Sequence, residues 1–213
     1  MKHLILPTLI WLILLSNVAL AHTPVFLSEK DRTGVHIGPL ITEPDYSWAY
    51  YGRLASGLAA SHGSAAAPTV EILPVAAQAG QELRLRLAIP QRPELRAFRP
   101  RVAVIGPGLP ALASDDPILS GLPVKPGEGE GVLLVPEGKP EASFEPFTQV
   151  KYWDYPRLAS RFPATAPYRI VIYDPAGRGG RYTLAIGAKE RLGIKDILTF
   201  PLTLARIRVW LWK

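Results

Sequence analysis

The chain has 213 residues, with 24 Lys and Arg against 18 Asp and Glu, and no cysteine. This length suits one domain with a substantial core, and the lack of cysteine excludes disulfides, thiolate metal sites and a cysteine nucleophile. The formal net charge of +6 is not gathered in a Lys/Arg block, so nucleic acid is not an expected partner, whereas anionic membrane surfaces and acidic polymers are acceptable ones.

Residues 1–21 have the parts of a signal peptide. Lys2 precedes an apolar stretch over residues 4–15, and Ala19 and Ala21 stand where signal peptidase requires small residues. The apolar stretch is too short to span a bilayer. We therefore expect an exported protein, periplasmic or extracellular, in which residues 22–45 form an extended N-terminal segment.

Frequent Pro and Gly divide the following residues into short apolar runs. Leu and Arg alternate over residues 82–89, which predicts a strand with one solvent-exposed face, and residues 69–75 are its expected antiparallel partner. Other runs predict further strands over 49–54, 101–105 and 132–135.

A hairpin is predicted near the end of the domain. Residues 168–173 and 181–186 flank a connection rich in Gly, which tolerates positive φ. The close spacing of short strands favours an all-β fold, a single antiparallel β-sandwich of jelly-roll type over residues 46–190. The long connections 106–130 and 137–147 would then carry the specificity of the surface.

The C-terminal segment, residues 191–213, is apolar and basic, and it contains Pro201. It is too short and too charged for a membrane span. One interpretation is an interfacial anchor whose membrane contacts are Arg206, Arg208, Trp210 and Trp212. The other is that the segment packs on the domain, with both tryptophans turned inward and Leu211 outward.

Five stretches, taken in order, carry a resemblance to a known family. They are Tyr46–Leu54, Gly80–Leu83, Phe98–Pro110, Tyr168–Asp174 and Gly177–Gly187. This order resembles secreted proteins related to bacterial pre-peptidase C-terminal domains. The resemblance implies a compact jelly-roll sandwich that serves as an accessory module rather than a catalyst. Family members often carry an acidic segment before the Gly80 region, but residues 64–72 are Ala-rich here, so no calcium-binding role is carried over.

Two groups of residues are candidates for ligand binding. Cleavage after Ala21 would expose His22, whose α-amino and imidazole nitrogens could chelate copper together with His36 or His62. The alternative is that these histidines are solvated, and no other cofactor is expected. A second group could form a flat platform for a sugar ring or a peptide, although such aromatics also fill sandwich cores. Its members are Glu145, Tyr152, Trp153 and Tyr155.

The sequence as a whole favours a non-catalytic exported accessory or interaction module. Its partner would be an unidentified protein or glycan, and a membrane surface is a further candidate. The alternatives are a copper-binding protein that uses His22 and a carbohydrate-binding module.

Overall fold

The computed structural model describes residues 22–27, 34–57, 69–146, 148–190 and 194–212. The predicted signal peptide, His62 and residues 64–68 of the Ala-rich stretch lie outside these residues. The strands are β1 (Thr23–Phe26), β2 (Val35–Ile37), β3 (Trp48–Leu54), β4 (Val70–Ala77), β5 (Glu82–Pro90), β6 (Arg101–Pro107), β7 (Glu130–Leu134), β8 (Glu141–Glu145), β9 (Val150–Asp154), β10 (Leu158–Arg161), β11 (Ala166–Tyr173) and β12 (Gly180–Ile186). The helices are η1 (Pro93–Leu95), α2 (Pro117–Gly121) and α3 (Ile194–Trp212).

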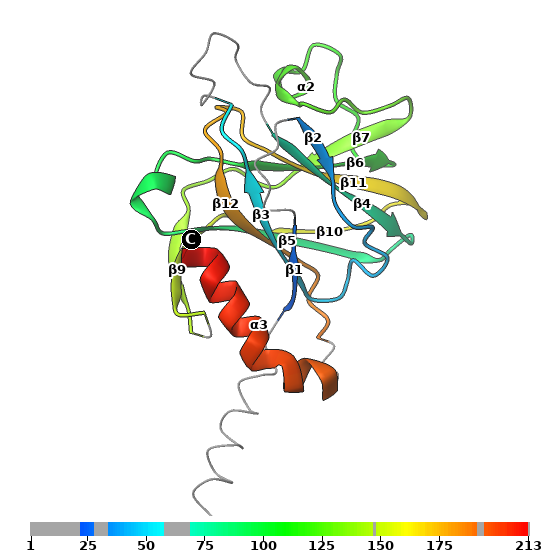
Figure 1. Ribbon diagram of the computed structural model, residues 1–213. Coiled ribbons are helices and arrows are strands. Elements are labelled where there is room, and N and C mark those ends of the chain that lie inside the picture. Colours follow the sequence, from blue (N-terminus) through cyan, green and yellow to red (C-terminus); the bar gives the residue numbers. More distant parts are fainter. Residues whose placement is uncertain (1–21, 28–33, 58–68, 147, 191–193, 213) are drawn as a thin grey trace, which may run out of the picture.

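Two sheets pack face to face, which confirms the predicted all-β sandwich (Figure 1). Sheet A has the order β1-β3-β12-β5-β9-β8, and β10 also pairs with β5. Sheet B has the order β2-β4-β11-β6-β7. Most pairs are antiparallel, but β1 runs parallel to β3 and β2 runs parallel to β4, so both sheets are mixed. The segment 22–45, which the sequence predicts to be extended, thus contributes an edge strand to each sheet.

The main core lies between the sheets. In β5 the three leucines that alternate with Arg84 and Arg86 are almost fully buried, as the period of two predicts. They pack in one cluster with the inward side chains of β11 and β6. The members of this cluster include Leu83, Leu85, Leu87, Val102, Val104, Ile170 and Ile172.

All seven predicted strands are present, but the two predicted pairings are wrong. The strands β4 and β11 lie in sheet B, where they pair with each other, whereas β5 and β12 lie in sheet A and pair there. The connections after β4 and β11 therefore carry the chain across the core. After β11, the buried Asp174 accepts hydrogen bonds from the amides of Ala176, Arg178 and Gly179, which folds this connection into a compact turn.

The outer face of each sheet is also covered. Leu112, Leu119, Leu122 and Val124, in and around α2, pack on the outer side chains of sheet B, so the long connection 106–130 serves partly as core. Helix α3 crosses the outer face of sheet A (Figure 1). Each sheet therefore buries apolar side chains on both of its faces, which stabilises the sandwich without disulfides.

Candidate functional site on the C-terminal helix

Helix α3 packs on sheet A through one face. Ile207, Trp210 and Leu211 are buried there against β3, β5 and β9. The Trp210 ring meets the Tyr51 ring edge-on, with 5.3 Å between ring centroids, and Tyr51 in turn stacks on Phe26. This contact confirms that the C-terminal segment docks on the domain, but it corrects the predicted orientation: Leu211 points inward, and Trp212 points outward.

Two arginines from sheet A and its neighbouring loop hold the C-terminal end of α3. The Nη1 of Arg181 donates to the carbonyl of Trp210 at 2.7 Å, and the Nη1 of Arg92 donates to the carbonyl of Leu211 at 3.0 Å. The last carbonyls of a helix lack partners within the helix and carry partial negative charge, so both contacts are favourable. The Arg181 guanidinium also lies 5.3 Å from the centre of the Trp210 ring. The end of α3 is therefore fixed to the sandwich.

The opposite face of α3 is apolar and open to solvent. Leu202 is 75% exposed, Val209 53% and Trp212 67%. Together with the exposed Ala205, these side chains recur at intervals of three and four residues, which places them along one side of the helix. We call this set, Leu202, Ala205, Val209 and Trp212, the outer stripe. It is a second apolar face that docking on sheet A does not use.

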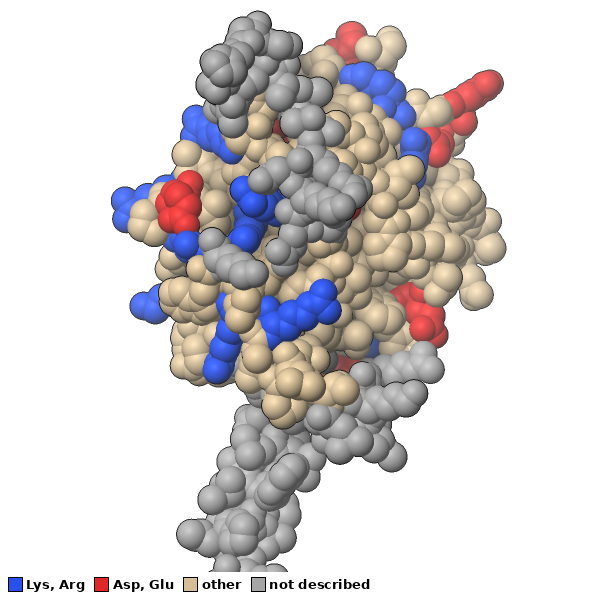
Figure 2. Space-filling model, in the orientation of Figure 1, with Lys and Arg blue, Asp and Glu red and all other residues tan. Residues whose placement is uncertain are grey.

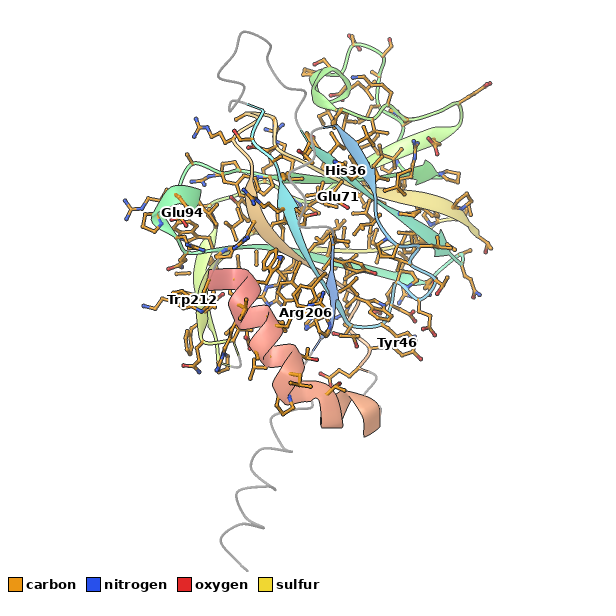
Figure 3. All side chains as sticks on the ribbon, in the orientation of Figure 1. His36, Tyr46, Glu71, Glu94, Arg206 and Trp212 are labelled. Carbon is orange, nitrogen blue, oxygen red and sulfur yellow. The ribbon has the colours of Figure 1, made fainter. Side chains whose placement is uncertain are left out.

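Basic side chains border the outer stripe. At about 100° per residue, Arg206 lies on one side of the stripe and Arg208 on the other. The Arg206 guanidinium lies 4.0 Å from the centre of the Phe26 ring on β1, which orients it beside the helix (Figure 3). Lys and Arg gather on the face of the molecule where α3 lies, with few Asp and Glu among them (Figure 2). An apolar stripe in a basic surround therefore faces solvent.

Of the three candidate copper ligands, the structure describes His22 and His36 but not His62. His22 precedes β1 on sheet A, where burial and the nearby Arg86 lower the pKa of its imidazole and Glu145 opposes them. His36 lies on β2 in sheet B, next to Glu71 on β4 (Figure 3). Among the described residues, which exclude His62, no group of three or more His, Asp or Glu could hold a metal ion. Copper binding stays a prediction.

The proposed aromatic platform is divided among three places. Tyr152 points to the outer face of sheet A and is buried in the cluster that includes the inner face of α3, where burial raises the pKa of its hydroxyl. Trp153 and Tyr155, which follows the end of β9, both pack against the main core. Glu145 accepts a hydrogen bond from the Thr148 amide at the tip of the β8–β9 hairpin. The structure does not bring these four residues onto one surface.

Sequence reasoning missed the residues that make α3 a site. Leu202 and Val209 form the outer stripe, and Arg92 and Arg181 fix the helix, but none of them was singled out. The apolar recurrence at 202, 205, 209 and 212 is the signal that would have revealed the stripe. Pro201, which cannot donate to the helix ladder, masks that signal because it argues against a helix.

No family model matches the chain, and no curated protein matches it. Among solved structures, the periplasmic inhibitor of g-type lysozyme PliG from Aeromonas hydrophila aligns over 73% of this chain and 100% of its own, with 13% sequence identity and a TM-score of 0.39. This similarity is too low to support a conclusion about fold or function.

Within the described residues, no helix combines the length and the apolar character that crossing a bilayer requires.

Proposed function

We propose that this protein is an exported, non-catalytic interaction module that rests on an anionic membrane surface through α3. The observation that carries the proposal is the outer stripe, an exposed apolar row with Arg206 and Arg208 on its two sides. Interfacial helices use this arrangement, because the apolar row enters the boundary of the acyl chains while the arginines meet lipid phosphates. The sandwich then presents its remaining surface to a protein or glycan partner.

The energies are sufficient for reversible binding. Full burial of a large apolar side chain is worth roughly 1.5–3 kcal/mol, and Leu202, Val209 and Trp212 would each be partly buried in the interface. Each Lys or Arg near an anionic surface adds about 1 kcal/mol. Because α3 is already folded and fixed by Arg92 and Arg181, binding does not have to order the helix.

Vesicle flotation tests the proposal. The chain beginning at His22, which contains every described element, is mixed with vesicles of phosphatidylcholine and phosphatidylglycerol. We expect it to float with them, and we expect the triple variant Leu202→Ser, Val209→Ser, Trp212→Ser to stay at the bottom of the gradient. All three side chains are exposed, so the variant should fold normally.

The matched control removes exposed apolar side chains elsewhere. Val35 and Ile37 on β2 are 58% and 76% exposed, and they belong to sheet B rather than sheet A. The double variant Val35→Ser, Ile37→Ser should float like the unmodified chain. Equal flotation of the triple variant and the unmodified chain would refute the role of the outer stripe, as would no flotation of the unmodified chain.

A further inference from the structure

A cavity of about 260 Å³ lies where the chain crosses from β7 in sheet B to β8 in sheet A. Residues 99–102, which lead into β6, form one wall, and residues 135–138, which follow β7, form another. Leu87 of β5 and Tyr155 complete the lining from the side of sheet A. None of these residues belongs to α3 or to the outer stripe, so the cavity is independent of the proposed membrane contact.

The chain leaves this space open for local reasons. Strands β9 and β10 both pair with β5. Because β9 ends at Asp154 and β10 begins at Leu158, the residues between them interrupt this pairing. Pro156 in this gap packs closely on the crossover: a Cβ built on Gly138 would lie only 2.8 Å from the Cγ of Pro156. Pro100 and Pro136 stiffen the two walls. The shape of the cavity therefore follows from the strand interruption and from the prolines in its walls.

The lining combines an apolar floor with a basic rim. Leu87, Val102 and Val135 are buried, which gives the floor three aliphatic side chains. The rim carries two guanidinium groups, of which Arg101 is paired with Glu137 at 2.9 Å. Among the described residues, Arg99 forms no ion pair with a carboxylate; its Nη1 donates to the carbonyl of Phe98 at 2.8 Å, and its guanidinium also lies beside the Tyr155 hydroxyl. The one carboxylate of the lining, that of Glu137, is thus paired with Arg101 and not with Arg99.

Tyr155 adds a polar group to the wall. Its hydroxyl oxygen is buried and makes no hydrogen bond of normal geometry with the described residues. Burial raises the pKa of this hydroxyl, the charge of the nearby Arg99 guanidinium and its contact with the hydroxyl oppose the rise, and the Asp174 carboxylate adds to it. A buried hydroxyl without a partner is costly, and such groups in native proteins usually bind a water molecule or a ligand. The hydroxyl and the guanidinium lie close enough to contact the same anion.

We propose that this cavity binds a carboxylate that carries a short apolar group. A guanidinium matches the two oxygens of a carboxylate, the Tyr155 hydroxyl can donate to the same group, and the aliphatic floor takes the apolar part. The volume lies below the usual range of about 300–1,000 Å³ for ligand pockets, which limits the ligand to a few carbon atoms beyond the carboxylate. Two sources fit this chemistry, a free short-chain carboxylic acid and the C-terminal residue of a peptide.

An NMR titration of the ¹⁵N-labelled chain beginning at His22 tests the proposal. The probes are hexanoate, N-acetylalanine as a mimic of a peptide C-terminus, and N-acetylalaninamide as the neutral control. We expect saturable shifts of the amides of Val102 and Gly138 with at least one carboxylate and none with the amide. Hexanoate alone as the binder would identify a free acid as the source, and N-acetylalanine alone would identify a peptide terminus. Absence of saturable shifts at the cavity with both carboxylates would overturn the proposal.

Substitutions decide whether Arg99 binds the carboxylate. Arg99→Met should weaken binding at least about tenfold, the usual effect of losing a hydrogen bond to a charged group. Arg96→Met removes an exposed guanidinium three residues earlier and should leave the affinity unchanged. Tyr155→Phe should weaken binding by a smaller factor. Unchanged affinity of a folded Arg99→Met variant would overturn the proposal; if that variant does not fold, the map of shifted amides in the unmodified chain decides alone.

Discussion

At the scale of single residues, Glu71 makes stability depend on pH. This carboxyl group on β4 is buried beside the core, and burial raises its pKa from 4.5 to about 7. The folded state therefore holds the Glu71 proton more tightly than the unfolded state does. Its contribution to stability is complete below pH 4.5 and is lost as the pH rises through about 7, a change of about 3 kcal/mol.

The variant Glu71→Gln keeps the side chain neutral at every pH. We expect it to exceed the unmodified chain in free energy of unfolding at about pH 8 by up to about 3 kcal/mol, and to lose this advantage at about pH 4. Urea denaturation at both pH values measures the difference, with the exposed Glu128→Gln as control. A gain that is equal at the two pH values would show that Glu71 does not ionise in this range.

At the scale of elements, α3 depends on one of its two C-terminal tryptophans. Trp210 is 2% exposed and packs on Tyr51, whereas Trp212 is 67% exposed. Trp210→Ala should therefore lower the free energy of unfolding by about 3–5 kcal/mol, and Trp212→Ala should change it by less than about 0.5 kcal/mol. Thermal unfolding followed by circular dichroism compares the two variants. Similar losses in both would contradict the orientation of the helix.

Local patterns in the sequence predict the strands but not their pairing, the orientation of α3 or the cavity. Alternation within β5 and β12 identifies strands, because a period of two is a local property. Pairing is not local: residues 174–180 have the composition of a hairpin turn, yet they join β11 of sheet B to β12 of sheet A. In α3 the apolar recurrence of the outer stripe is a local signal, but Pro201 argues against a helix, and only the docked position separates Trp210 from Trp212. The cavity combines residues far apart in the chain, which no local pattern reveals.

At the scale of the whole molecule, the charge distribution predicts that the proposed membrane binding depends on salt. The chain has a formal charge of +6, and basic side chains gather on the face that carries α3 (Figure 2). Salt shortens the screening length from about 10 Å at 0.1 M to about 3 Å at 1 M. We expect affinity for the anionic vesicles to fall as NaCl is raised over this range, measured by tryptophan fluorescence. Affinity that does not change with salt would exclude the arginines as phosphate contacts.

The pairing pattern of the sandwich has a consequence for how the chain reaches its final state. Strand β3 pairs with β12, and β4 pairs with β11, so two strands from the first 77 residues obtain their central neighbours from residues 166–186. A nascent polypeptide emerging from its N-terminus has neither sheet complete until those late strands appear. Neither sheet can therefore reach its native pairing until most of the chain has been synthesised, and the early apolar strands stay exposed to non-native contacts meanwhile.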